Sequence, residues 1–237
     1  MIYRIALCFT LLASAFGKLS AASAQTDPIR VAAAYSKIYV PDGYDSNDLV
    51  QVVGEGLFRN TCYRHAETLV SVDEASKTIL VGPVAYEYKG YCIQVVLPFQ
   101  RVMDVGILKP GKWTVKQDGG ANLAEFTVVS AKTDSADDYL YAPVSQAFFR
   151  QIRGASQVIV SGEFSSDCMS LDSEKVTIQS DVIVVQPIAK MDARANCVSG
   201  KFPFSKSIFM PSLKAGRFLL HTRSTGGNAL NSLVDVN

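Results

Sequence analysis

Histidine is the side chain that most often carries acid–base chemistry near neutral pH, and this sequence contains two, His65 and His221. Serine-type hydrolysis needs a histidine that is held against a nucleophilic hydroxyl and oriented by a carboxylate. Serine and aspartate are abundant, but the sequence has no G-x-S-x-G motif to identify a nucleophile. We therefore expect surface or strand-end positions for both histidines, with a hydrolase that uses His221 or His65 as the alternative.

A second group of polar residues lies in the segment PDGYDSNDL. Its side chains Asp42, Asp45, Asn47 and Asp48 could offer hard oxygen ligands to Ca²⁺. The spacing is not that of an EF-hand, no bidentate glutamate follows, and Asx turns explain the same residues without a metal. We predict no metal site and no cofactor, and leave calcium binding by this loop open.

The cysteines are the third group that could carry chemistry. Four of the five lie in the body of the chain, and the fifth lies near the N-terminus; the four are Cys62, Cys92, Cys168 and Cys197. No two of them have the C-x-x-C spacing that zinc sites and thiol redox sites use. Disulfides are the chemistry that we expect, and four cysteines allow three pairings.

The N-terminal segment predicts export. Arg4 precedes an uncharged, mostly apolar run over residues 5–16, and the tripeptide Ala-Ser-Ala that ends at Ala24 is a small-x-small cleavage site. We predict a signal peptide over residues 1–24, because the apolar run is shorter than the about 20 residues needed to cross a bilayer. No later stretch is long and apolar enough for a membrane anchor. We expect the mature chain to be exported, periplasmic or extracellular, where disulfides persist.

The charge of the mature chain argues against a nucleic-acid partner. Removal of residues 1–24 would take Arg4 and Lys18 from the total of 23 basic residues and leave 21 against 22 acidic ones. Proteins that bind nucleic acid usually carry a basic stripe that neutralises phosphates, and none is visible in this sequence. We expect no nucleic-acid partner.

The chain repeats itself at a separation of 104 to 107 residues. LKPGKWTV, beginning at Leu108, returns as LKAGRFLL, and QVVGEGLF returns as QVIVSGEF. The remaining matches, in unbroken order, are Cys62 with Cys168, Pro83 with Pro187, Cys92 with Cys197, Phe99 with Phe204, and Gly119-Gly120 with Gly226-Gly227. We interpret this order as an internal duplication with small loop insertions. The predicted units are repeat 1 over residues 28–130, a linker over 131–138, and repeat 2 over 139–237.

The duplication selects one disulfide pairing. Only Cys62–Cys92 with Cys168–Cys197 gives each repeat a bridge of its own, and the two spacings, 30 and 29 residues, are nearly equal. Each bridge would close a loop of about 30 residues. It would stabilise the fold by about 3–4 kcal/mol, because it lowers the chain entropy of the unfolded state.

The pattern inside each repeat is typical of β-strands. Residues 84–88 alternate as a half-buried strand requires, and short runs of valine, isoleucine, tyrosine and phenylalanine are broken by glycine and proline turns. The best helix-period segment, 138–152, is interrupted by Pro143. About seven strands in about 100 residues predict an all-β fold of two tandem immunoglobulin-like β-sandwich domains, with a barrel as second choice.

We interpret the repeated phrase as a corner between two strands. Its glycine would supply a backbone conformation that other residues avoid, and Trp113 or Phe218 would turn into the core behind Leu108 or Leu213. The phrase resembles the Leu-x-x-Gly-x-aromatic corner of bacterial immunoglobulin-like β-sandwich modules. The mature chain as a whole resembles uncharacterised bacterial secreted proteins that carry such modules in tandem, a resemblance that covers both repeats and implies no activity.

One aromatic cluster suggests recognition. Tyr86, Tyr88 and Tyr91 lie close together in VAYEYKGYC, and tyrosine combines an apolar face with a polar tip, although sheets are also rich in tyrosine. We take these three as a candidate binding surface and predict no catalytic residue. The expected function is that of a non-catalytic exported protein, binding or structural, of the bacterial cell envelope that recognises a protein or an envelope component. The alternative is an envelope hydrolase with a site near the inter-repeat cleft.

Overall fold

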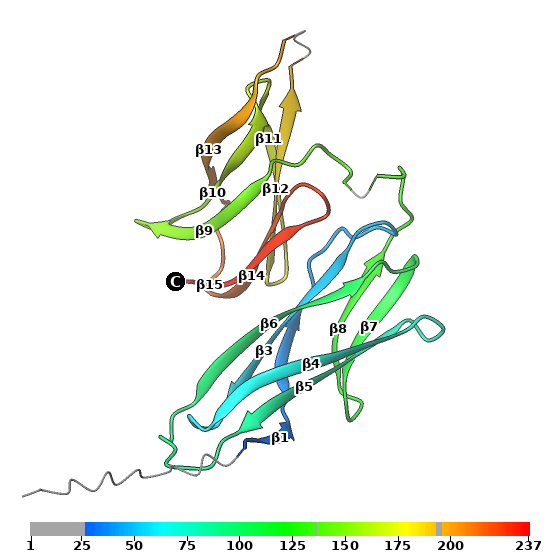
Figure 1. Ribbon diagram of the computed structural model, residues 1–237, viewed down its shortest axis with the longest axis vertical. Coiled ribbons are helices and arrows are strands. Elements are labelled where there is room, and N and C mark those ends of the chain that lie inside the picture. Colours follow the sequence, from blue (N-terminus) through cyan, green and yellow to red (C-terminus); the bar gives the residue numbers. More distant parts are fainter. Residues whose placement is uncertain (1–26, 136, 193–195) are drawn as a thin grey trace, which may run out of the picture.

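The computed structural model describes residues 27–135, 137–192 and 196–237, so the predicted signal peptide lies outside the described residues. Every regular element in these ranges is a strand, which confirms the all-β expectation (Figure 1). The first half contains β1 (Ile29–Ala32), β2 (Tyr35–Tyr39), β3 (Val50–Phe58), β4 (Tyr63–Asp73), β5 (Thr78–Glu87), β6 (Leu97–Gly106), β7 (Gly111–Gln117) and β8 (Asn122–Val128). The second half contains β9 (Val144–Ile152), β10 (Ala155–Ser166), β11 (Met169–Gln179), β12 (Val182–Met191), β13 (Ser199–Phe209), β14 (Gly216–Arg223) and β15 (Ala229–Val236).

Each half is a sandwich of two sheets. In the first half, β4, β5, β7 and β8 form one sheet with β1 beside β5, and β2, β3 and β6 form the other. In the second half, the corresponding sheets are β11-β12-β14-β15 and β9-β10-β13. The strand order is therefore the same in both halves when each strand is matched to the one seven places later. Both halves also contain one parallel pair, β5 with β7 and β12 with β14, among otherwise antiparallel pairings of the described strands.

Alternation along the strands places one apolar face in each core. In β3, Val50 and Val52 point into the first core, and in β14, Phe218 and Leu220 point into the second. The helix-period segment of the sequence contains β9, where phenylalanine and isoleucine favour a strand, in agreement with the break expected at Pro143.

The repeated phrase forms the same corner in both halves, as predicted. Gly111 and Gly216 have φ values of 143° and 152°, a region that residues with a Cβ avoid. Directly after the corner, Trp113 is fully buried in the first core, and its Nε1 donates a hydrogen bond to the carbonyl of Lys109 at 2.9 Å. Phe218 occupies the same place in the second core.

Two disulfides join the predicted partners, Cys62 with Cys92 and Cys168 with Cys197. Each bridge ties the connection that follows the long central strand, β3 or β10, to the loop that precedes the partner edge strand, β6 or β13. The two Cα–Cα distances are 5.3 and 5.6 Å. The same framework therefore closes both sandwiches.

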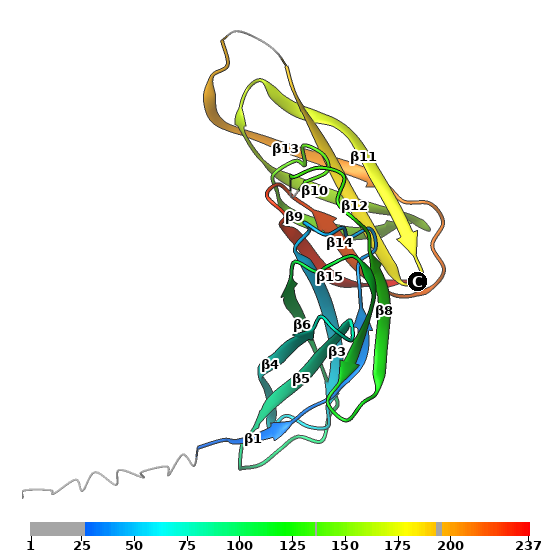
Figure 2. The same cartoon turned by 90° about the vertical axis from the view of Figure 1, so that its right-hand side faces the viewer.

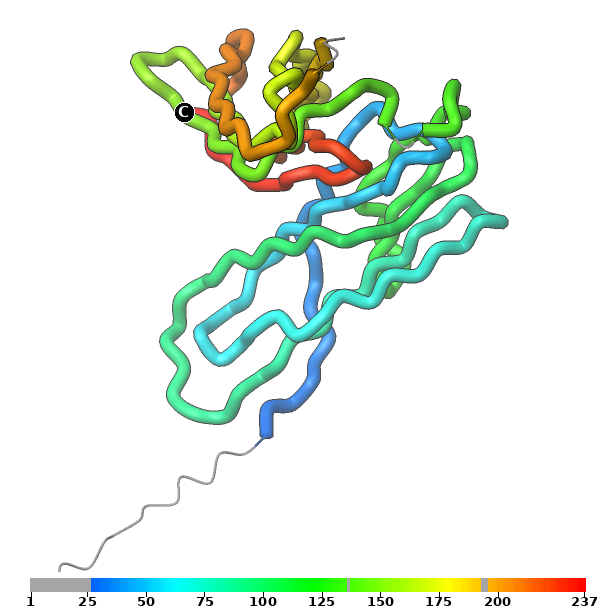
Figure 3. Tube along the Cα trace, turned by 45° about the horizontal axis from the view of Figure 1, so that its top comes forward, coloured from blue at the N-terminus to red at the C-terminus, as the bar shows by residue number. Residues whose placement is uncertain are grey.

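A third hydrophobic cluster joins the two halves. Tyr39 and Val53, on the outer face of the β2-β3-β6 sheet, pack against Val182, Val184 and Leu219 on the outer face of the β11-β12-β14-β15 sheet. Figures 2 and 3 show β14 and β15, in red, facing the first half. The outer faces of these two sheets thus cover each other around this cluster.

The predicted linker is attached to both halves by hydrogen bonds. The side-chain amide of Asn47 donates to the carbonyls of Thr133 and Ser135, at 2.8 and 2.7 Å. The carboxylate of Asp137 accepts from the backbone amides of Gly226 and Gly227, at 2.8 and 2.9 Å. This connection adds to the packed interface between the halves.

Candidate functional site

His221 is buried, so the expectation of a surface position was wrong for this residue, although it does lie near the end of β14. It lies on the outer face of β14, which the first half covers, and only 2% of it is exposed. Its Nδ1 lies 2.8 Å from Oδ1 of Asn231, and the ring of Tyr44 stands edge-on to it. Burial lowers the pKa of His221 to about 4, with a further lowering by Arg223.

The surroundings of His221 leave little room for a substrate. The cavity beside the ring, lined by residues that include Asp48 and Ser224, has a volume of about 10 Å³, space for about one water molecule. Among the described residues, the side-chain hydrogen-bond partner of the ring is an amide, not a hydroxyl or a carboxylate. This arrangement does not supply the nucleophile and base of a hydrolase.

His65 is half-buried on β4 and is part of a different network. Its Nδ1 accepts a hydrogen bond from Nε of Arg101 at 2.9 Å, and its Nε2 lies 3.0 Å from Oγ1 of Thr68. Burial, and then the charge of Arg101, lower the pKa of His65. A ring that receives a hydrogen bond from arginine is held in place, but among the described residues its Nδ1 has this arginine as partner and not the carboxylate that orients the histidine of a catalytic triad.

The acidic loop between β2 and β3 uses its carboxylates for structure. Oδ1 of Asp45 accepts from the backbone amide of Asn47 at 3.0 Å, and Oδ2 of Asp48 accepts from that of Asp45 at 2.9 Å, while Asp42 is exposed. Asp48 also forms a buried ion pair with Arg223. Within the described ranges, no group of three or more histidine, cysteine, aspartate or glutamate side chains is placed to hold a metal ion. The loop is an Asx-type turn at the interface between the halves.

The β5–β6 loop, residues 88–96, is the candidate binding site. It lies at the end of the first half that points away from the second half, beside β1 (Figures 1 and 2). The disulfide Cys62–Cys92 fixes its middle, and the backbone amide and carbonyl of Ile93 bond to Thr61, at 2.9 and 3.2 Å. The amide of Tyr88 donates to the carbonyl of Cys62 at 2.9 Å. The loop is thus anchored at three points along its length.

The loop presents apolar side chains to solvent. Tyr91 is fully exposed, Ile93 is 71% exposed, and their neighbours on the loop and on the end of β3 are at least 36% exposed. We call this group the tip patch; it consists of Leu57, Tyr88, Tyr91, Ile93, Val95 and Val96. Exposed apolar side chains that gather in one part of a protein surface often mark an interaction site.

The three predicted tyrosines are only partly brought together. The rings of Tyr86 and Tyr88 contact each other edge-on, with centroids 6.5 Å apart, whereas Tyr91 projects alone from the loop. Tyr86 lies on the outer face of the sheet, where the strand register places Arg30 of β1 and Arg64 of β4 on either side of it. The tyrosine cluster therefore lies between the apolar tip patch and a sheet face that carries Arg64 and the Arg30–Glu67 ion pair.

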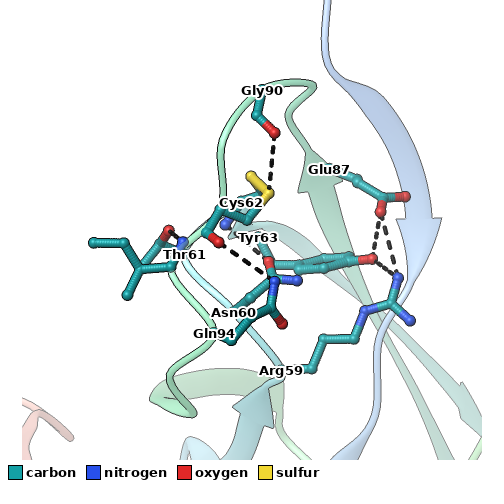
Figure 4. Close-up of a disulfide and its surroundings, with 10 residues drawn as sticks. Arg59, Asn60, Thr61, Cys62, Tyr63, Glu87, Gly90 and Gln94 are labelled. Carbon is teal, nitrogen blue, oxygen red and sulfur yellow. Dashed lines mark hydrogen bonds and ion pairs between the residues drawn. A yellow bond between two sulfur atoms is a disulfide. The ribbon is translucent and has the colours of Figure 1, made fainter.

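A groove opens next to the tip patch, between β1 and the end of β3. Its volume is about 390 Å³, and Val31, Leu57 and Phe58 contribute to its lining. Figure 4 shows the polar side of this groove, where the phenol of Tyr63 lies between the carboxylate of Glu87 and the guanidinium of Arg59. The hydrogen bond to Glu87 raises the pKa of Tyr63, so its hydroxyl stays protonated.

The corresponding loop of the second half differs in character. When the two halves of the chain are aligned at Cys92 and Cys197, Asn196 takes the place of Tyr91. The shared disulfide framework does not require the exposed tyrosine of the first half. The aromatic tip is thus a feature of one copy only, as a grafted binding site would be.

The tip patch contains two of the three tyrosines proposed from the sequence, Tyr88 and Tyr91, together with aliphatic residues that the sequence did not single out. The run Ile-Gln-Val-Val after Cys92 has the composition of a strand, which predicts burial. Nothing in the composition showed that these residues stand in a loop. The one available signal was their position next to a cysteine and a glycine turn.

Comparison with known proteins gave no matching family model, and neither the curated proteins nor the solved structures produced a match. Among the described residues, no helix is long and apolar enough to cross a bilayer.

Proposed function

We propose that this chain is an exported, non-catalytic binding protein of the bacterial cell envelope that recognises a protein or an envelope component through the tip patch. The observation that carries the proposal is the disulfide-anchored loop 88–96, which holds Tyr91 and Ile93 in solvent. Burying such side chains against a partner is favourable because apolar surface is removed from water. The two intramolecular disulfides are consistent with an oxidising compartment outside the cytoplasm.

The body of the protein, in this proposal, is a duplicated immunoglobulin-like unit with copies at residues 28–130 and 139–237. The strand order, the parallel pair and the disulfide recur in both halves. Beside β5 and β12, the amides of Ala33 and Ala142 donate to the carbonyls of Pro83 and Pro187, both at 2.9 Å. The parallel pair is a departure from the antiparallel sheets of antibody-type domains, so the likeness is to the two-sheet sandwich in its broad form.

The test is affinity capture from a cell-envelope extract with the purified exported chain and two variants. The double substitution Tyr91→Ser with Ile93→Ser should abolish capture of a reproducible partner. The matched control is Phe209→Ser, which removes a 73% exposed side chain from the second half and should leave capture unchanged. Equal capture by all three chains would reject the tip patch as the binding site. Turnover in a broad hydrolase screen that His221→Gln or His65→Gln abolishes would favour the hydrolase instead.

A further inference from the structure

The tip patch differs from a usual protein-binding surface in one respect: most of it is a single exposed loop with mainly aliphatic side chains. Ile93, Val95 and Val96 offer aliphatic surface with few hydrogen-bonding groups, and the fully exposed Tyr91 adds an aromatic ring with a polar end. Aromatic residues of this kind settle at the boundary between hydrocarbon and water in membranes. A projecting apolar loop can enter a fluid lipid layer without a partner surface of matching shape.

The charges around the tip patch favour an anionic surface. Loop 88–96 contains one ionisable charge at neutral pH, the positive charge of the exposed Lys89. Behind it, Arg30 and Arg59 form ion pairs with carboxylates, while Arg64 and Lys89 have no ion pair among the described residues. The carboxylate of Asp27 is also exposed at the start of the described chain. Four basic side chains thus stand beside three acidic ones, Glu67, Glu87 and Asp27, which leaves a net charge of +1 next to the loop, carried by Lys89 and Arg64 against Asp27.

We propose that the tip patch docks on an anionic lipid surface, with Tyr91, Ile93, Val95 and Val96 entering the headgroup region and Lys89 and Arg64 facing anionic headgroups. This inference rests on the proposed function and names its partner class. Binding of this kind combines the burial of apolar side chains with electrostatic attraction, so neither part alone is strong. Each basic side chain near such a surface contributes about a fivefold increase in affinity.

The experiment uses the purified exported chain and vesicles of phosphatidylcholine with or without phosphatidylglycerol. The chain should sediment with the anionic vesicles and not with the neutral ones, and high salt should weaken binding because it screens the headgroup charge. Tyr91→Ser with Ile93→Ser should weaken binding more than tenfold, and Lys89→Ala about fivefold. The matched controls Phe209→Ser and Lys214→Ala should bind as the original chain does. All five chains should have the same thermal unfolding midpoint, since the changed side chains are exposed.

A fluorescent reporter tests insertion directly. The chain has one tryptophan, Trp113, which is buried in the first core, so Tyr91→Trp adds a single exposed reporter at the tip patch. On anionic vesicles its emission should shift to shorter wavelength and be quenched by lipids with brominated acyl chains. The matched variant Phe209→Trp should show neither change.

Two outcomes would overturn the lipid assignment, and they separate it from the proposed function. If the anionic vesicles do not bind the chain, but capture from an envelope extract still requires Tyr91 and Ile93, the partner is a protein or a glycan and the proposed function stands. If the vesicles bind the chain and the tip-patch variant equally, the lipid contact lies elsewhere and the assignment fails. If both vesicle binding and tip-dependent capture are absent, both proposals fail.

Discussion

Arg223 and Asp48 form a buried ion pair that joins the two halves of the molecule. Nη1 of the arginine lies 3.2 Å from Oδ1 of the aspartate, and the two side chains are 7% and 9% exposed. Nη2 also donates to the carbonyl of Gly43 at 3.1 Å, so one arginine of β14 fixes both ends of the acidic turn. Burial raises the pKa of Asp48, although the charge of Arg223 opposes this effect. The interface therefore has the character of a protein interior, where removal of one partner is costly.

Asp48→Ala should lower the free energy of unfolding by about 3–5 kcal/mol, because it leaves the guanidinium of Arg223 buried without its carboxylate. Urea denaturation followed by circular dichroism measures the change. The double variant Asp48→Leu with Arg223→Met should recover most of the loss, because no uncompensated charge then remains. As a matched control, Lys112→Ala removes one partner of the exposed ion pair with Glu125 and should cost less than about 1 kcal/mol. A loss for Asp48→Ala no larger than that of the control would show that the pair does not stabilise the interface.

His221 should make the stability of the fold depend on pH. Because burial lowers its pKa to about 4, the folded chain keeps the ring neutral at pH values where the unfolded chain, with a pKa near 6.5, is protonated. The unfolded state binds more protons between these values, so the contribution of His221 is fully present above pH 6.5 and is lost as the pH falls towards 4. At about 1.4 kcal/mol per pKa unit, the whole contribution is about 3 kcal/mol.

The measurement is the urea midpoint between pH 4 and 7 for the original chain and for His221→Gln. The variant should show a shallower dependence on pH. Asp48 titrates with the opposite sign, since its raised pKa makes the folded state the better proton acceptor, but it is present in both chains and its contribution cancels in the comparison. Parallel pH profiles for the two chains would contradict the prediction.

The sequence could predict what repeats in it, and the structure agrees at those points. The corner glycines, the aromatic residues behind them and the cysteine pairing all follow from positions that recur about 105 residues apart. What could not be predicted is where the copies differ. Leu219 and Leu220 are consecutive apolar residues of β14, a sign that both faces of the strand are covered. In β5, however, Ile79 and Leu80 are also consecutive, and Leu80 is 37% exposed.

The sequence gives even less indication of which residues contact each other across the interface between the two halves. Asp48 and Arg223 are 175 residues apart, and nothing in their local sequence links them. His221 follows an apolar pair near a strand end, a position that fits exposure as well as burial. The aliphatic part of the tip patch was missed for the opposite reason, because Val95 and Val96 have strand-like composition but lie in a loop. Pairing between distant faces depends on tertiary packing, which periodicity does not encode.

Gly56 and Gly162 are equivalent positions that should both reject a side chain. A Cβ on Gly56 would lie 2.4 Å from the ring of Phe99 and 2.5 Å from the carbonyl oxygen of Ala34, and one on Gly162 would lie 2.0 Å from the carbonyl oxygen of Pro143. Gly56→Ala and Gly162→Ala should each destabilise the fold by about 3 kcal/mol, because the backbone must shift to relieve the overlap.

The matched control is Gly154→Ala, where no atom lies within 4 Å of the added Cβ. Because φ is positive at this position, the substitution should cost only the backbone strain of an alanine in this conformation, about 1 kcal/mol. Differential scanning calorimetry of the three variants gives the comparison. Costs for Gly56→Ala and Gly162→Ala equal to that of the control would show that the close approach of the strands can be relieved.

The exported chain should begin at Gln25. The cleavage site ends at Ala24, and a signal peptidase requires small residues at both ends of the tripeptide before the cut, here Ala22 and Ala24. Intact mass and N-terminal sequencing of the secreted product measure the start. Ala24→Lys should leave the precursor uncut, while Ala24→Gly should be processed normally. A product that retains residues 1–24, or a chain that stays in the cytoplasm, would contradict export by this segment.

The two disulfides should contribute equally to stability and unequally to binding. They close loops of nearly equal length, with separations of 30 and 29 residues, so Cys62→Ser with Cys92→Ser and Cys168→Ser with Cys197→Ser should each cost about 3–4 kcal/mol. Only the first pair anchors the tip patch. Its loss should release loop 88–96 and weaken partner or vesicle binding, because the loop must then be ordered again on binding. Denaturation and binding measured on both double variants provide the test. If binding falls equally in both, the effect follows global stability, and the loop does not need its anchor.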